Sequence, residues 1–123
     1  MAHILVVDDS STMRELVAGF LRRHQFEVSV AIDGVDGLQQ LKLDPGLRLI
    51  VCDINMPNMD GLTMAEKIRT ELNNREVHII MLTTEDNPAM RDRGRQIGVT
   101  GWIVKPFKGE AVLGAFRRLC GLS

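Results

Sequence analysis

Short apolar runs alternate with amphipathic stretches along the whole chain. The runs lie at residues 4–7, 27–31, 47–52, 77–82 and 102–104, and their aliphatic, β-branched content is typical of strands buried in a parallel sheet. Between and after them apolar residues recur at helical spacing, as at Val112, Ala115, Phe116 and Leu119. Five successive strand–helix units predict an α/β fold, a doubly wound five-stranded parallel sheet with helices on both faces.

Local signals mark several of the predicted helix ends. Thr12 and Glu15 have the spacing of a capping box at the front of the first helix. The segment 44–46, Asp-Pro-Gly, ends the second helix. Pro88 is placed in the first turn of the fourth helix, where its missing N–H is tolerated.

Size and composition indicate one globular domain spanning residues 1–123, with 45% hydrophobic and 25% charged residues. No run approaches the roughly 18 apolar residues of a transmembrane helix, and the first residues carry no basic flank or cleavage site. We therefore expect neither a membrane span nor a signal peptide. Cys52 and Cys120 lie in apolar segments, which fits core residues in a reducing compartment, so we predict a cytoplasmic location.

Charge is balanced overall and unevenly distributed. The formal net charge of −1 gives no electrostatic footprint for nucleic acid or a membrane, and we expect neither as a partner. Residues 1–62 carry nine acidic and five basic side chains, whereas residues 84–123 carry four acidic and seven basic ones. This asymmetry suggests that the acidic charge of residues 1–62 and the basic charge of residues 84–123 each serve a function.

Four of the five predicted strands end at residues that carry chemistry. Ligands of open parallel sheets bind beyond the carboxyl ends of the strands, so the residues just after each run are the candidates. These are Asp8 and Asp9 after the first strand, Asp53 after the third, Thr83 and Thr84 after the fourth, and Lys105 after the fifth. Three carboxylates, a hydroxyl and an ammonium are expected to meet at one edge.

That set of groups suits phosphoryl transfer. Three carboxylates in a small cleft raise one another's pKa unless a cation lies among them, and Mg²⁺ is the natural hard cation where phosphate is involved. A carboxylate beside Mg²⁺ can attack phosphorus and form an aspartyl phosphate, while a lysine and a hydroxyl stabilise the transferring oxygens. Taken singly, Asp9 could simply cap a helix and Lys105 could end a strand, but Asp53 has no local structural reason to end an aliphatic run.

Three segments carry a family resemblance that covers the whole chain. They are residues 6–14 (VVDDSSTMR), 53–62 (DINMPNMDGL) and 101–107 (GWIVKPF). In order and spacing they resemble a bacterial two-component response-regulator receiver domain, and more narrowly the stand-alone chemotaxis type (CheY-like). The resemblance implies a flavodoxin-like (βα)5 fold.

The resemblance also assigns roles by position. It implies that Asp53 is the phosphoacceptor and that Asp8, Asp9, Asp53 and the backbone carbonyl of Asn55 hold Mg²⁺, for which Mn²⁺ can substitute. It implies that Thr83 and Trp102 form the switch, that Lys105 contacts the phosphoryl group before a cis proline, and that Asn55 and Glu85 tune autodephosphorylation. The partner surface would include Arg91, Arg95, Trp102 and Lys108.

Two positions depart from the family pattern. The switch aromatic is usually Tyr or Phe, and Trp102 is bulkier. Thr84 follows the switch hydroxyl where a small residue is common, and its β-branched side chain would obstruct an inward rotamer of the indole.

The sequence thus predicts a monomeric, phosphorylation-activated signalling switch. A sensor histidine kinase of the chemotaxis type would phosphorylate Asp53, a phosphatase could reset it, and the output would be binding to a flagellar motor switch protein. The chain itself would catalyse only its own phosphotransfer and dephosphorylation. We therefore do not expect it to be an enzyme that acts on an outside substrate. The chain ends soon after Cys120, which argues against a fused DNA-binding regulator.

Three alternatives stay open. The chain could be a single-domain phosphorelay intermediate or a receiver with a non-flagellar output. More distantly, it could be an aspartate-nucleophile phosphohydrolase. A resemblance to that class would imply an Asp-x-Asp pattern after the first strand, whereas here Asp8 and Asp9 are adjacent.

Overall fold

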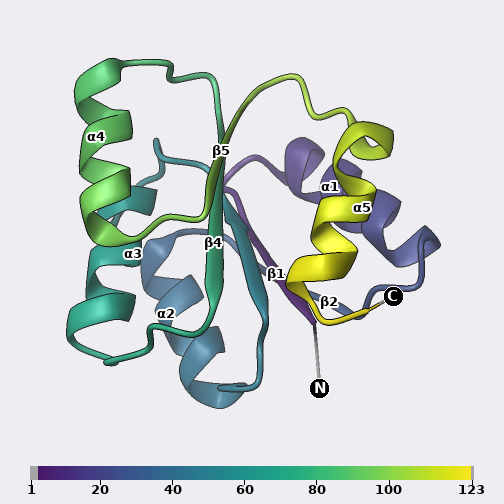
Figure 1. The fold of residues 1–123 in the computed structure, drawn as a ribbon, viewed down its shortest axis with the longest axis horizontal. Coiled ribbons are helices and arrows are strands. Elements are labelled where there is room, and N and C mark those ends of the chain that lie inside the picture. The colour runs from purple at the N-terminus through teal and green to yellow at the C-terminus, as the bar shows by residue number, and fades with distance from the viewer. Residues whose placement is uncertain (1–2, 123) are drawn as a thin grey trace.

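The computed structural model describes residues 3–122 as a central sheet between two layers of helices (Figure 1). The strands are β1 (Ile4–Val7), β2 (Val28–Ala31), β3 (Leu49–Cys52), β4 (His78–Thr83) and β5 (Gly101–Val104). The helices are α1 (Ser11–Arg23), α2 (Gly34–Leu43), α3 (Gly61–Thr70), α4 (Pro88–Ile97) and α5 (Gly109–Leu119). The expected absence of a signal peptide rests partly on residues 1–2, which lie outside the described residues.

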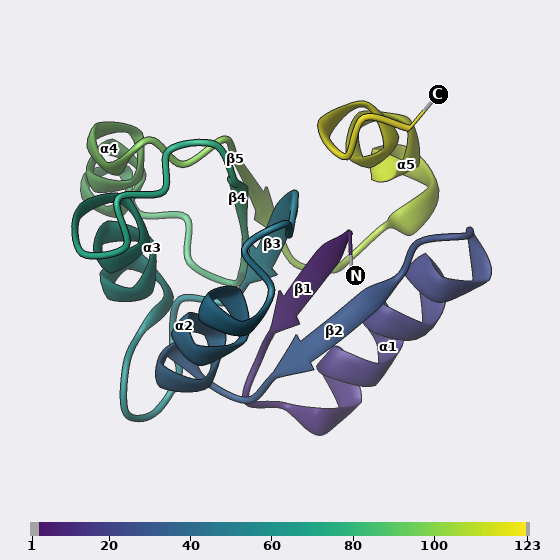
Figure 2. The ribbon, with the colours of Figure 1, turned by 90° about the horizontal axis from the view of Figure 1, so that it is seen from below.

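The sheet has the predicted doubly wound topology. Its order is β2-β1-β3-β4-β5, and every neighbouring pair is parallel. Figure 2 shows α1 and α5 on one face of the sheet and α2, α3 and α4 on the other. Strand order reverses beside β1, which places the switch point of the topology between β1 and β3.

The two faces of the sheet belong to two hydrophobic clusters. Leu5 and Val7 of β1 lie in the cluster that includes Ile68 of α3, whereas Ile4 and Val6 lie in the cluster that includes Phe116 of α5. Successive side chains of a strand point to opposite faces, so a continuous aliphatic run is buried on both. This explains why the predicted strands lie within two residues of the observed ones.

Side-chain caps fix the starts of four helices, α1 to α4. The capping box predicted at Thr12 is wrong: α1 begins two residues earlier than that box implies, and Ser10 is its cap, accepting the Met13 N–H at 3.2 Å. Ser10 is the cap because its backbone is extended, as a helix cap requires, whereas Thr12 already lies inside the helix. Pro88 lies in the first turn of α4, as predicted.

Arg69 of α3 is buried without a carboxylate partner among its hydrogen bonds. Its guanidinium donates to the backbone carbonyls of Asn74, Val77 and Gly98 at 3.0, 2.7 and 2.9 Å. Burial lowers its pKa, and the charge of Arg75 adds to that effect. Arg69 therefore ties the end of α3 to the segment before β4 and to the end of α4.

No helix in residues 3–122 is long and apolar enough to cross a membrane.

Replacing Arg69 tests this tie. Arg69→Met keeps the apolar stem but leaves three carbonyls without their donor, so we expect the free energy of unfolding to fall by about 2–4 kcal/mol. The control is Arg93→Met on α4, an exposed position where the change should stay within about 0.5 kcal/mol. Urea unfolding at neutral pH measures both, and equal stabilities of the two variants would contradict the role of Arg69.

Candidate functional site

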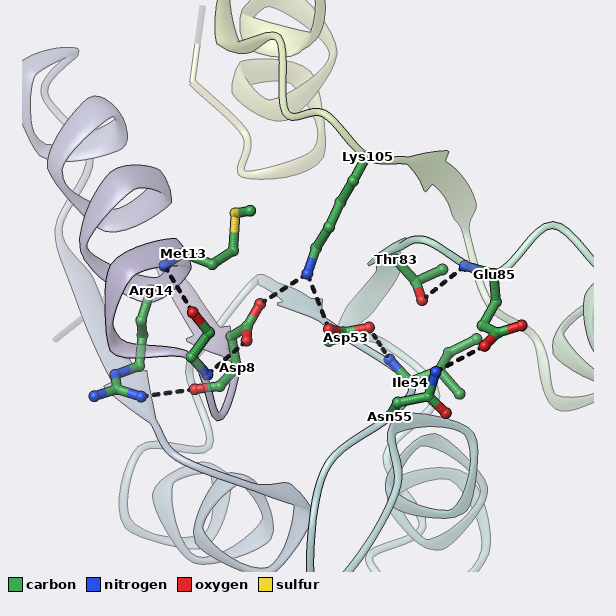
Figure 3. A network of polar contacts seen from close by, with 10 residues as sticks. Asp8, Met13, Arg14, Asp53, Ile54, Asn55, Thr83, Glu85 and Lys105 are labelled. Carbon is green, nitrogen blue, oxygen red and sulfur yellow. Dashed lines mark hydrogen bonds and ion pairs between the residues drawn. The ribbon is translucent and has the colours of Figure 1, made fainter.

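Strand register brings the predicted site residues to one edge of the sheet. Val7 of β1 lies opposite Cys52 of β3, so the residues that follow them, Asp8 and Asp53, leave the sheet side by side. Thr83 of β4 lies opposite Val104 of β5, which places Lys105 just beyond it. Figure 3 shows Lys105 extending toward the space between Asp8 and Asp53. The structure therefore assembles the carboxylates, the hydroxyl and the ammonium as the sequence predicted.

Asp8 is the buried acid of the cluster and Asp9 the exposed one. One carboxylate oxygen of Asp8 accepts the Ser10 N–H at 2.9 Å, and its backbone carbonyl accepts a bond from the Arg14 guanidinium at 2.8 Å. Burial raises the pKa of Asp8, and the nearby charge of Asp53 adds to this, although the Ser10 bond and Lys105 oppose it. Its ionised form is thus held in the folded protein at a cost in stability.

Lys105 balances part of this negative charge. Its Nζ lies 2.9 Å from Oδ2 of Asp53 and 3.4 Å from Oδ2 of Asp8. Burial alone would lower the pKa of Lys105, but its hydrogen bond to Asp53 and the charges of both carboxylates outweigh burial and raise it. Lys105 is therefore a permanent cation in the cluster, and the peptide bond to Pro106 is cis, as the resemblance implied.

The acidic residues fit a hard divalent cation. One carboxylate oxygen from each of Asp8, Asp9 and Asp53 can be chosen so that all three lie within 4.8 Å of one another. Oxygen donors of this charge are those that Mg²⁺ binds, with water completing its shell. Asn55 follows Asp53 by two residues, and its backbone carbonyl is a candidate further ligand.

Glu85 connects Thr83, Trp102 and Asn55, which lies in the loop after β3. Figure 3 shows Glu85 with Thr83 and Asn55. Its N–H donates to Oγ1 of Thr83 at 3.2 Å, and its carbonyl accepts from Nε1 of Trp102 at 2.9 Å. Its carboxylate accepts from the Asn55 side chain at 2.8 Å. The Thr83 hydroxyl is thereby connected to Trp102 and to Asn55 through Glu85, by two hydrogen bonds in each case. Thr84, which the sequence predicted would obstruct an inward rotamer of the Trp102 indole, is exposed.

The predicted partner residues lie along α4, β5 and the start of α5 (Figure 1). Arg91 pairs with Asp86 at 2.8 Å and lies 5.5 Å from the centroid of the Trp102 ring, and Arg95 pairs with Asp92. Lys108 is exposed. The basic charge of α4 is thus partly neutralised by neighbouring acids.

A cavity of about 700 Å³ lies at the opposite edge, where the strands begin. Its lining includes His3, Arg48, Glu76 and His78 and none of the predicted site residues. The acidic cluster is therefore distinct from this hollow.

Sequence reasoning assigned no role to Arg14 or to the backbone of Glu85. Arg14 lies one turn into α1, and its spacing of six residues from Asp8 is the only signal that it could reach the strand end. A backbone carbonyl such as that of Glu85 leaves no signal in residue identity, so its bond to Trp102 required the structure.

Comparison with known proteins agrees with the geometry. Residues 4–117 match the response regulator receiver domain family. The chain is 40% identical over 119 residues to chemotaxis protein CheY1 of Helicobacter pylori, an alignment that covers 90% of this chain and 96% of that protein. Chemotaxis response regulator CheY4 of Vibrio cholerae superposes with a TM-score of 0.87 at 36% identity, covering 97% of this chain and 98% of that one.

A second similar structure was determined with ligands. Response regulator TrrA of Thermotoga maritima, in complex with Mg²⁺-BeF, has a TM-score of 0.83 at 28% identity and covers 97% of this chain and 99% of that one. The strand-end carboxylates, the sheet order and the match over residues 4–117 support one conclusion. The chain belongs to the response regulator receiver domain family.

Proposed function

We propose that the chain is a phosphorylation-activated switch that accepts a phosphoryl group on Asp53 from a sensor histidine kinase. The observation that carries this proposal is the Asp53 carboxylate at the sheet edge, 2.9 Å from the Lys105 ammonium and grouped with the carboxylates of Asp8 and Asp9. A carboxylate oxygen of Asp53 attacks phosphorus, the bond from phosphorus to the donor's imidazole nitrogen breaks, and its electron pair leaves with the imidazole. The product is an acyl phosphate on Asp53.

The residues around Asp53 serve this step in distinct ways. Asp8, Asp9, Asp53 and the Asn55 carbonyl would hold Mg²⁺, with Mn²⁺ as a substitute, and the cation supplies positive charge for the transferring oxygens. Lys105 contributes a second positive charge beside the same oxygens, and the Thr83 hydroxyl can donate to one of them. The Mg²⁺-BeF complex of the Thermotoga maritima relative supports this assignment.

The proposed output is a change in affinity for a partner in chemotaxis, with a flagellar motor switch protein as the expected partner. The similarity to the two chemotaxis proteins supports this output. The acyl phosphate would shift an existing equilibrium between two conformations, and a nearly complete swing needs a bias of roughly 5 kcal/mol. The hydrogen bonds of Glu85 to Thr83 and Trp102 offer a route from the phosphorylation site to the partner surface. The Asn55–Glu85 pair would tune autodephosphorylation.

Two other outputs compete within the same chemistry, a phosphorelay intermediate and a non-flagellar receiver. An aspartate-nucleophile phosphohydrolase is the distant alternative. We propose no outside substrate, because the groups at the site are all accounted for by self-phosphorylation.

The function is tested by phosphorylation from a small donor such as acetyl phosphate. We expect the intact mass of the protein to rise by one phosphoryl group in a Mg²⁺-dependent reaction, and Asp53→Asn to show no increase. Glu76→Gln, an exposed acid at the opposite edge, is the control and should react like the natural chain. Phosphorylation of Asp53→Asn, or turnover of a generic phosphate monoester, would contradict the proposal.

The output is tested with beryllofluoride, which mimics the phosphoryl group. Trp102 is the only tryptophan, so its fluorescence reports the switch. We expect beryllofluoride with Mg²⁺ to change this signal and to tighten binding of a peptide from a flagellar switch protein at least several-fold. A changed signal without a change in peptide affinity would rule out the motor output and favour the phosphorelay.

Asp8 and Asp9 differ in burial, and their variants should differ accordingly. In a chelator at pH 7, Asp8→Asn should be more stable than the natural chain, because burial raises the pKa of Asp8 above its usual 3.8 and disfavours its charge. This gain should vanish below about pH 4, where Asp8 is protonated in both the folded and the unfolded chain. Asp9→Asn, at an exposed position, should show no such gain.

The same two variants measure the cation site. At a Mg²⁺ concentration about a hundred times its Kd, the natural chain should gain about 2.7 kcal/mol, and both variants should lose most of that gain. Thermal and urea unfolding with and without Mg²⁺ give these values. Equal Mg²⁺ stabilisation of all three proteins would show that the carboxylates do not hold the cation.

A further inference from the structure

The loop between β3 and α3 is bound to the start of α2, a contact between segments far apart in the chain. The Asn58 side-chain amide donates to Oδ2 of Asp33 at 2.7 Å. In the same place the Gly34 N–H donates to the Met59 carbonyl at 3.2 Å. Figures 1 and 2 both show α2 and α3 side by side on one face of the sheet, with this loop leading into α3.

The contact is closely fitted on both sides. A Cβ atom at position 34 would lie 2.7 Å from the Met59 carbonyl oxygen, so only glycine allows this approach. Asn58 has a φ of 67°, a left-handed conformation in which asparagine is among the best-tolerated residues after glycine. Asp33 is only 5% exposed although it is an acid at a helix start.

Asp33 uses its two carboxylate oxygens for two different tasks. Oδ1 accepts the Asp36 N–H at 2.8 Å and caps α2, while Oδ2 accepts from Asn58. These bonds lower the pKa of Asp33, with the Asp36 bond as the largest cause, so the group is ionised at neutral pH and can accept both. The cap alone would need one oxygen, and the second one is given to the loop.

The loop that Asp33 holds carries Asn55. At its base, the Ile54 N–H donates to Oδ1 of Asp53 at 2.7 Å and the Gly61 N–H donates to the Ile54 carbonyl at 2.9 Å. Asn55 lies between this base and Asn58, with its side chain bonded to Glu85. The backbone of the intervening segment is therefore fixed at Ile54 on one side and at Asn58 on the other.

We propose that Asp33 and Asn58 are positioning residues for the cation site: their bond holds the loop so that the Asn55 carbonyl is in place for the metal. This inference rests on the proposed function, in which that carbonyl is a ligand. Groups that orient the ligands of a metal change its affinity without touching it. The pair thus couples the start of α2 to a site built on β1 and β3.

The chemistry of the pair allows it to be broken without removing the helix cap. In Asp33→Ser the hydroxyl oxygen can still accept the Asp36 N–H as a helix cap, but no second oxygen remains to accept from Asn58. Asn58→Gly removes the donor and keeps the left-handed φ available. The double variant Asp33→Asn with Asn58→Asp restores a bond of reversed polarity at unchanged net charge.

The experiment measures Mg²⁺ affinity by calorimetry and amide exchange of residues 54–60 in a chelator. We expect Asp33→Ser and Asn58→Gly each to weaken Mg²⁺ binding by about tenfold and to speed exchange in the loop, and the double variant Asp33→Asn with Asn58→Asp to keep both near those of the natural chain. Asp36→Asn is the matched control: it removes one negative charge from the same helix turn, keeps an oxygen for the Ile32 N–H, and should leave affinity and loop exchange unchanged.

Each result decides the inference. Natural affinity in Asn58→Gly, or equal loss in Asp36→Asn and Asp33→Ser, would overturn it while leaving the proposed function intact. A natural chain that binds no Mg²⁺ would overturn the proposed function, and the inference with it. Faster loop exchange with unchanged affinity would show a purely structural bond and would also overturn the inference.

Discussion

Mutual repulsion among three carboxylates is the constraint on which this structure depends. Parallel register places Asp8 beside Asp53, and oxygens of Asp8, Asp9 and Asp53 lie within 4.8 Å of one another. Two unit charges 4 Å apart interact by about 4 kcal/mol at the effective dielectric of a protein surface, which is a large part of the 5–15 kcal/mol that stabilises a typical domain. Such a cluster persists only beside positive charge. Lys105, within 3.4 Å of both Asp8 and Asp53, supplies it from a different strand.

The fold keeps each member of the cluster in place from outside the cluster. Arg14 fixes the carbonyl of Asp8 from α1, and Glu85 bonds to Thr83 and Trp102 from the loop before α4. The start of α2 holds the loop after β3 through Asn58. Helices from both layers and the loops after β3 and β4 therefore contact the segments that carry the site. This arrangement is suited to a switch, because a local change in charge acts on segments that hydrogen bonds already hold in place.

The sequence predicted the features that depend on residue type and period. Unbroken aliphatic runs located the strands, and the parallel topology that follows from strand–helix alternation placed Asp8, Asp53, Thr83 and Lys105 at one edge. Features that depend on backbone geometry were not predictable. Ser10 caps α1 instead of Thr12 because the chain is still extended at Ser10. The buried bonds of Arg69 end on carbonyls, which every residue carries.

The bond between Asp33 and Asn58 shows the same limit. Asp33 and Gly34 have the composition of a simple turn, and nothing in the local sequence indicates that the second carboxylate oxygen reaches a residue 25 positions away. The pairing of Arg91 and Arg95 with neighbouring acids was likewise not predicted, since a count of charges in residues 84–123 does not show which side chains meet.

The most direct test of the charge balance is the Mg²⁺ affinity of Lys105→Met, measured by calorimetry beside Lys108→Met. Lys108 is an exposed lysine three residues away. If the Lys105 ammonium shares the carboxylates with the cation, its removal leaves them with less positive charge, and Mg²⁺ should bind several-fold more tightly to Lys105→Met than to the natural chain or to Lys108→Met. An affinity equal to or weaker than that of Lys108→Met would contradict the account, because Lys105 would then not be balancing the repulsion among Asp8, Asp9 and Asp53.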